Sequence, residues 1–287
     1  MTVATGVGRL AGKVVLVTGA GRGLGRATAL HLASAGARVA VNDLDPVLVA
    51  ERVEEIAAAG GRALAVPGSV ADWDMAERMV GDTAAHFGRF DGLVNNAGLH
   101  YRAMPWEENP VRVRTAVEVN VLGSLYCAIH AATYFRAQGS GAVVNIASAG
   151  ALGAPQRAVY GASKGAILSF TYGLARDVAP YGIRVNALAP LAATRMTDPT
   201  LDGEGEGNDH GAQAGEFAAM PDPSEIAPAI AWLLSDSASS VTGQVVRFNG
   251  RTLSLIDPPA LSDRRYEQDR WTSDDIGEAL ARLTATS

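Results

Sequence analysis

Short apolar runs alternate with alanine-rich stretches of helical length along most of the chain. We expect strands at 13–18, 38–42, 61–66, 92–95, 142–147, 183–188 and 244–248. We expect helices at 24–35, 46–59, 73–87, 111–135, 158–178 and 225–234. Such alternation implies a parallel sheet with helices on both faces, and strands that are apolar throughout fit a sheet covered on both sides. The pattern predicts an α/β fold with a doubly wound parallel sheet of about seven strands.

The alternating pattern covers residues 1–257 without a composition break, so we expect a single domain there. Residues 202–215 are rich in Gly, Asp and Glu, which favours a loop. We interpret 191–221 as a mobile lid over a substrate. Residues 258–287 form a C-terminal extension, in which Thr272 can cap a short helix with an apolar stripe.

Composition narrows the classes of function. The formal charge of −6 argues against a nucleic-acid partner, because phosphate binding needs a basic surface. The first ten residues lack the features of a signal peptide, and every apolar run is shorter than the roughly 20 residues of a membrane span. Cys127 is the single cysteine, which suits a reducing cytoplasm and is typical of a buried apolar residue. We expect a cytoplasmic protein with no membrane or metal site.

A glycine-rich segment separates the first expected strand from the first helix. Glycines at such a junction let backbone N–H groups approach a pyrophosphate, and the helix N-terminus adds partial positive charge. The strand before and the helix after supply the context that this motif requires, although a structural turn is the alternative. The candidate cofactor residues here are Gly19, Gly21, Arg22, Gly23, Leu24 and Gly25.

Asp43 ends the second expected strand, about 20 residues beyond the glycines, and Leu44 follows it. A carboxylate there can accept a hydrogen bond from the adenosine ribose and would repel a 2′-phosphate. Arg22 argues the other way, since a basic residue could meet that phosphate. Because Asp43 should touch the discriminating hydroxyl directly, we favour NAD over NADP.

Tyr160 and Lys164 are four residues apart on an expected helix, so they share one face. A free phenol has a pKa of about 10, and a nearby ammonium would lower it toward a useful value for a base. Ser148 follows a strand at the edge where open parallel sheets form sites, and its hydroxyl could hold a substrate oxygen or only cap a turn. Asn120 lies in an apolar helical stretch, as a structural clamp or as part of a water relay.

Together these residues resemble the short-chain dehydrogenase/reductase family, with its Rossmann-like fold, from about residue 13 to 250. The resemblance implies that Tyr160 is the acid/base, that Lys164 lowers its pKa and binds the nicotinamide ribose, that Ser148 positions the substrate oxygen and that Asn120 anchors a water. Hydride would pass between the substrate carbon and the nicotinamide. The resemblance also implies a homotetramer or homodimer, and cofactor contacts from Asn96, Ala97 and Gly98.

The chain departs from the family pattern at two strand ends. Ser69-Val70 replaces the usual Asp-Val that meets the adenine, so the adenine contact through that side chain is in doubt. Pro190-Leu191 replaces Pro-Gly, and Thr194 is the expected contact for the nicotinamide amide. A weaker likeness to the (3R)-hydroxyacyl-CoA and steroid dehydrogenases suggests a hydrophobic substrate.

We therefore expect an NAD(H)-dependent oxidoreductase that interconverts a secondary alcohol and a ketone of a small molecule. One alternative is an NADPH-dependent 3-oxoacyl carrier-protein reductase, against which Asp43 argues. Another is a regulator that senses NAD without turnover, against which Tyr160 and Lys164 argue.

Overall fold

The computed structural model describes residues 10–192 and 220–284. The chain separates into two compact units, Met1–Ile256 and Asp257–Ser287. Thr194 and nearly all of the expected lid at 191–221 lie outside the described residues, so both stay predictions.

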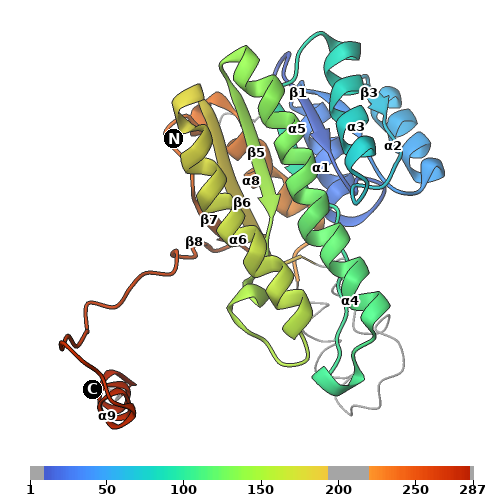
Figure 1. The fold of residues 1–287 in the computed structure, drawn as a ribbon. Coiled ribbons are helices and arrows are strands. Elements are labelled where there is room, and N and C mark those ends of the chain that lie inside the picture. Colours follow the sequence, from blue (N-terminus) through green and yellow to red (C-terminus); the bar gives the residue numbers. More distant parts are fainter. Residues whose placement is uncertain (1–9, 193–219, 285–287) are drawn as a thin grey trace. The chain divides into compact units, whose positions relative to one another are not determined.

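The first unit is built on one sheet, whose strand order is β3-β2-β1-β4-β5-β6-β7-β8 (Figure 1). Strands β1 to β7 pair in parallel, which confirms the predicted doubly wound α/β fold. The described strands are β1 (Val14–Val17), β2 (Arg38–Val41), β3 (Arg62–Ala65), β4 (Gly92–Asn95), β5 (Gly141–Ile146), β6 (Ile183–Pro190), β7 (Val245–Phe248) and β8 (Leu253–Leu255).

The described sheet has eight strands, which agrees with the expected number of about seven and adds one at the edge. The eighth, β8, runs antiparallel to β7 at the edge of the sheet. The Asn249 side chain accepts hydrogen bonds from the N–H groups of Arg251 and Thr252 and so forms the turn between the two strands. All three β8 residues are exposed, so no buried apolar run marks this strand in the sequence.

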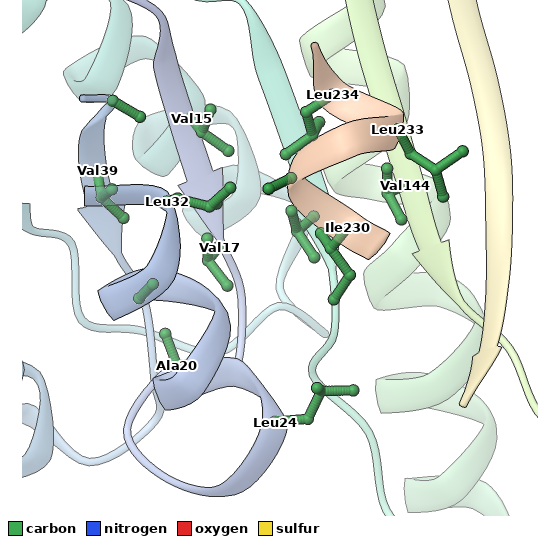
Figure 2. Close-up of a cluster of buried hydrophobic side chains, with 14 of the residues drawn as sticks. Val15, Val17, Ala20, Leu24, Leu32, Val39, Val144, Ile230, Leu233 and Leu234 are labelled. Atoms are coloured by element: carbon green, nitrogen blue, oxygen red, sulfur yellow. The ribbon is translucent and has the colours of Figure 1, made fainter. Parts of the chain in front are cut away.

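Helices cover both faces of the sheet (Figure 1). The first face packs against α1 (Gly23–Ser34), α2 (Pro46–Ala58) and α8 (Pro223–Leu234). Figure 2 shows Leu32 of α1 and Ile230 of α8 among the strand residues Val17 and Val144. The second face packs against α3 (Trp73–Phe87), α5 (Gly123–Gln138) and α6 (Ala158–Val178). Cys127 of α5 is fully buried there, and burial raises the pKa of its thiol to about 12, so it acts as an apolar core residue.

The long helix expected at 111–135 is not continuous α-helix. It consists of α4 (Pro110–Val117), a π-helical turn at Glu118–Leu122 and then α5. A π-turn inserts one residue, which shifts the phase of the helix, and such turns occur frequently at functional sites. Asn120 lies within this turn and is fully buried. The sequence did not predict this turn, because a hydrophobic pattern that repeats every 3.6 residues does not reveal a single inserted residue.

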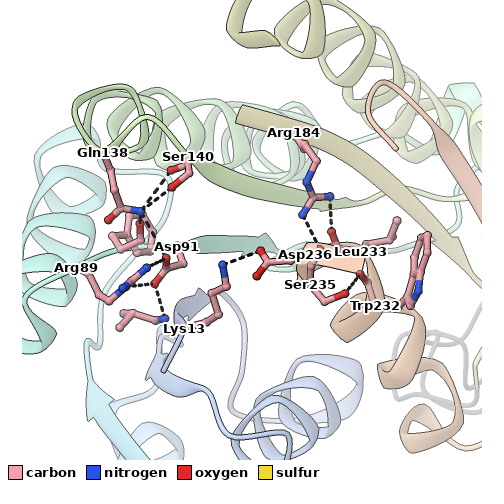
Figure 3. Close-up of polar contacts among 12 residues, drawn as sticks. Lys13, Arg89, Asp91, Gln138, Ser140, Arg184, Trp232, Leu233, Ser235 and Asp236 are labelled. Carbon is pink, nitrogen blue, oxygen red and sulfur yellow. Dashed lines mark hydrogen bonds and ion pairs between the residues drawn. The ribbon is translucent and has the colours of Figure 1, made fainter. Parts of the chain in front are cut away.

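The amino ends of the central strands carry a network of structural ion pairs (Figure 3). Lys13, just before β1, pairs with Asp236 at 2.8 Å, and Arg89 pairs with Asp91 at 2.6 Å. Burial acts to raise the Asp91 pKa, but the hydrogen bonds from Arg89 and from the Val14 N–H outweigh it and lower that pKa. This edge is therefore stabilised by polar contacts within the protein, and the opposite edge carries the candidate chemistry.

The second unit contains α9 (Ser273–Thr284), where the sequence predicts a short helix. Thr272 Oγ1 accepts from the Asp275 N–H, and the Asp275 carboxylate accepts from the Thr272 N–H, which is the reciprocal cap expected at a helix start. Among the described residues, none of the helices combines the length and the apolar character that crossing a membrane would require.

Candidate active site

The candidate residues follow the carboxyl ends of β1, β2, β4 and β5. β1 and β4 are neighbours in the sheet. From β1 the chain continues outward to β2 and β3, and from β4 it continues in the opposite direction to β5 and β6. Loops after such neighbouring strands diverge and leave a crevice at the carboxyl edge, where open α/β sheets bind ligands. The topology thus brings the phosphate-loop motif and the Tyr160 motif to one edge.

The glycine loop between β1 and α1 is shaped by close backbone approach. Gly19 has a φ of +61°, and a Cβ on it would lie 2.8 Å from the Ala97 Cα. A Cβ on Gly25 would overlap the carbonyl oxygen of Gly19. Side chains are thus excluded where the loop enters the helix, and Arg22 at the N-cap of α1 is exposed. This cradle, in which glycines allow close approach to the backbone at a helix N-terminus, fits a pyrophosphate.

Asp43 lies directly beside this loop. Its carboxylate accepts the Gly21 N–H at 2.9 Å and the Asp45 N–H at 3.3 Å. A Cβ on Gly21 would lie 2.7 Å from the Asp43 Oδ2, so only glycine leaves room for this contact. Leu44, the next residue, is 74% exposed. The carboxylate predicted to choose between NAD and NADP therefore also orders the loop that would bind the pyrophosphate.

The end of β4 is joined to the end of β1 through Thr18 and Asn96. The Thr18 hydroxyl accepts the N–H groups of Asn96 and Ala97 at 3.0 and 3.1 Å. The Asn96 side-chain amide donates to the carbonyls of Thr18 and Gly19, both at 2.9 Å. These bonds hold the segments after β1 and β4 together. This role of Thr18 as a double acceptor depends on the pairing of β1 with β4.

Asn120 acts as a clamp on the segment after β4. Its side chain accepts the Leu99 N–H at 2.6 Å, donates to the Leu99 carbonyl at 2.9 Å and donates to Ser163 Oγ at 3.0 Å. The sequence left Asn120 either as a structural clamp or as part of a water relay, and these contacts are those of a structural clamp. Ser163 in turn donates to the Tyr160 carbonyl at 2.7 Å, a link that sequence reasoning missed.

Lys164 is buried on α6, one turn after Tyr160. Its Nζ donates to the Ile146 carbonyl at the end of β5, at 2.7 Å. Burial lowers the pKa of Lys164 to about 8, so the ammonium is still mainly charged at neutral pH. A Cβ on Gly98 would lie 3.6 Å from this Nζ, which places the end of the Asn96–Gly98 segment next to the ammonium.

Tyr160 is almost fully buried. Burial raises the pKa of its phenol, while a hydrogen bond with Ser148 and the charge of Arg157 act to lower it. The Lys164 Nζ lies 6.0 Å from the centre of the phenol ring. Burial outweighs these two effects, so the Tyr160 pKa lies above its ordinary value, and the lowering of this pKa by Lys164 stays a prediction.

Ser148 follows β5 and begins a short 3-10 turn, Ala149–Leu152. Its Oγ accepts the Gly150 N–H at 3.0 Å, so the serine caps this turn as well as facing Tyr160. The capping role offered by the sequence is therefore observed, and the hold of Ser148 on a substrate oxygen stays a prediction.

The remaining cofactor candidates have mainly local contacts. Ser69 accepts the Ala71 N–H at 3.2 Å, and Val70 is buried against Gly123 at the start of α5. Pro190 ends β6, beside β7. Leu24 is buried in the core under the glycine loop.

Comparisons with known proteins agree with this fold. A family model described as enoyl-(acyl carrier protein) reductase matches residues 19–250. The 3-oxoacyl-(acyl-carrier-protein) reductase of Staphylococcus aureus is 37% identical over 83% of this chain and 97% of its own. The 2,5-dichloro-2,5-cyclohexadiene-1,4-diol dehydrogenase of Sphingobium indicum is 36% identical over 84% of this chain and 97% of its own.

A crystal structure of a short-chain dehydrogenase from Mycobacterium avium superposes with a TM-score of 0.83 and 34% identity over 96% of both chains. The chain belongs to the short-chain dehydrogenase/reductase family. It is therefore an oxidoreductase of a family that binds a nicotinamide cofactor.

Proposed function

We propose that this protein is an NAD(H)-dependent dehydrogenase that interconverts a secondary alcohol and a ketone. The observation that carries the proposal is the convergence of Tyr160, Ser148 and Lys164 at the sheet edge that also carries the glycine cradle. When bound, the nicotinamide ring accepts or donates the hydride; the protein supplies geometry and proton transfer.

Tyr160 is the acid/base of the proposed reaction. Its raised pKa keeps the phenol protonated at neutral pH, ready to donate the Oη proton to a ketone oxygen during reduction. In the oxidative direction the phenol must first lose that proton, which positive charge nearby favours. Arg157, whose charge acts to lower the Tyr160 pKa, and Lys164, whose Nζ lies 6.0 Å from the centre of the phenol ring, are the cationic side chains that could supply it. Ser148, which hydrogen-bonds with the phenol, would share the substrate oxygen with it.

Asp43 supports NAD(H) as the cofactor. Its carboxylate is anchored by the Gly21 N–H beside the cradle, where the adenosine ribose would lie. A ribose hydroxyl can donate to the second carboxylate oxygen, whereas a 2′-phosphate would place two negative groups in contact. Arg22, the cation that could offset this, is exposed on the loop.

The surroundings of the site favour a hydrophobic substrate, such as a hydroxyacyl thioester or a steroid-like alcohol. Apolar side chains project from the segments after β4 and β5, and they are substantially exposed: Leu99 at 41%, Trp106 at 77% and Leu152 at 66%. Exposed apolar surface next to a catalytic edge is what a hydrophobic ligand would cover.

The alternative activity is NADPH-dependent reduction of a 3-oxoacyl group on a carrier protein. It is favoured by the name of the Staphylococcus aureus relative, whereas the diol dehydrogenase of Sphingobium indicum fits the oxidative reading equally well. Turnover measured with NADH and with NADPH separates the two proposals.

The decisive experiment is a panel of secondary alcohols, hydroxyacyl-CoAs and hydroxysteroids, assayed for NADH production at 340 nm. Tyr160→Phe should bind NADH and lose all turnover. Tyr172→Phe is the matched control, because Tyr172 is on the same helix and its hydroxyl bonds the Ile256 carbonyl instead. If Tyr160→Phe turned over substrate like the control, the proposed mechanism would be wrong.

We also propose a homotetramer or homodimer in the cytoplasm. Support comes from apolar side chains exposed along α4 and α5, which include Val117, Ile129 and Tyr134. Light scattering on the purified protein tests the assembly, and a monomer at micromolar concentration would exclude it.

A further inference from the structure

His100 makes a contact with the candidate acid/base that the sequence did not indicate. Its imidazole ring meets the Tyr160 ring edge to face, with the ring centres 4.6 Å apart and the planes at 85°. His100 lies just after the Asn96–Gly98 segment, on the loop that follows β4. Aromatic rings favour this perpendicular arrangement, so the contact restricts how the phenol ring can turn.

The backbone on both sides of His100 is fixed. Leu99, the residue before it, has both its N–H and its carbonyl bonded by the Asn120 side chain, at 2.6 and 2.9 Å. Three residues after His100, the Ala103 N–H donates to the Gln156 carbonyl at 2.9 Å. The loop that carries the imidazole is therefore tied to the π-helical turn at Glu118–Leu122 at one end and to the segment before α6 at the other.

The acceptor residue of this second tie, Gln156, has an unusual backbone conformation. Gln156 has a φ of +59°, the left-handed conformation that residues with a side chain rarely adopt. It directly precedes Arg157, the N-cap residue of α6 and the cation that acts on the Tyr160 pKa. The loop after β4 and the start of the Tyr160 helix are thus joined beside the two rings, so the imidazole and the phenol are presented to each other by bonded backbone.

We propose that His100 is a positioning residue for Tyr160, and that the Asn120 clamp on Leu99 serves the reaction by presenting this imidazole. The phenol Oη must reach both Ser148 and the substrate oxygen. Gly150 packs closely beside the ring, since a Cβ there would lie only 3.3 Å from Tyr160 Cε1, closer than an ordinary van der Waals contact. The ring of His100 restricts the phenol ring from turning away from Ser148. This inference rests on the proposed function of Tyr160 as acid/base.

The test compares His100→Ala with His100→Phe, using the best substrate of the alcohol panel. His100→Ala should lower kcat about 10- to 100-fold, because a small misplacement of a reacting group has effects of that order. Its dissociation constant for NADH, measured by fluorescence titration, should stay within about 2-fold, since His100 lies outside the glycine cradle. His100→Phe keeps an aromatic edge against Tyr160 and should restore kcat to within about 3-fold of the wild type.

His86→Ala is the matched control. His86 meets Phe87 with the same ring separation, 4.6 Å, and a similar angle, 88°, at the end of α3 and away from the sheet edge. It should leave kcat and NADH binding unchanged.

Each outcome of these assays either supports or overturns the inference about His100. Wild-type kcat in His100→Ala overturns the inference, and so does a Phe variant as slow as the Ala variant, because ring packing would then not be the cause. Should His100→Ala fail to fold, His100→Leu fills the same space without a ring and must show the same loss of kcat. A wild-type protein without turnover on the whole panel would instead count against the proposed function.

Discussion

Replacing Asp43 with Asn should separate its observed contact with the Gly21 N–H from its proposed contact with the adenosine ribose. The amide oxygen of Asn can still accept the Gly21 N–H that the carboxylate accepts at 2.9 Å, so the glycine loop should keep its shape. What disappears is the negative charge that, in the proposed complex, would face the adenosine ribose. The variant therefore changes cofactor preference with little effect on folding.

The expected magnitude follows from these contacts. A hydrogen bond to a charged acceptor contributes about 1.5–3 kcal/mol and a neutral one about 0.5–1.5 kcal/mol, so NADH binding should weaken by about 1–1.5 kcal/mol, or roughly 5- to 10-fold. Repulsion of a 2′-phosphate by the half-buried carboxylate is screened to about 1–2 kcal/mol at this exposure, and its loss should strengthen NADPH binding about 10-fold. The preference for NADH over NADPH should fall about 50- to 100-fold.

The assay is fluorescence titration with each dinucleotide at fixed ionic strength. Asp45→Asn is the matched control, since it removes the same charge two residues away, where the carboxylate caps α2 through the Val47 N–H. An equal NADH-to-NADPH preference in Asp43→Asn and Asp45→Asn would refute the assignment of Asp43 to the ribose.

Lys164→Met should abolish turnover yet change stability in a defined way. The Lys164 pKa is about 8 when folded and 10.5 in its ordinary state, so the unfolded chain binds more protons between these values. The unfolding free energy of the wild type should gain about 3 kcal/mol from this group as pH rises from about 8 to about 10.5. Thermal melts across that range should show a smaller gain in the Met variant; parallel curves would contradict the assigned pKa. Gly25→Ala, which forces its Cβ onto the Gly19 carbonyl, should weaken NADH binding more than 10-fold and destabilise the fold by about 1–3 kcal/mol. Gly165→Ala, with nothing within 4 Å, should leave binding intact and raise stability by up to about 1 kcal/mol in urea denaturation. Similar NADH affinities in the two alanine variants would show that the cradle does not bind the dinucleotide.

Local patterns were enough to place the elements that carry the site. The glycine loop was predicted between a strand and a helix, and Tyr160 and Lys164 on one helix, because these assignments depend only on spacing within a few residues. The prediction of one continuous helix at 111–135 is wrong at the π-turn around Asn120, because a single inserted residue leaves no periodic signal in the sequence. Strand β8 was missed because its residues are exposed and follow a tight turn.

By itself, the chain's pattern of apolar runs and glycines determined a parallel α/β sheet, a cradle suited to a pyrophosphate and a phenol one helical turn from an ammonium. Only the tertiary structure decided what these groups touch. The bond from Lys164 to Ile146, the Asn120 clamp on Leu99 and the ring of His100 against Tyr160 all join segments that lie apart in the chain. The physical reason is that periodicity reports which face of an element is buried, whereas hydrogen bonds between loops depend on how strands are ordered and paired across the sheet.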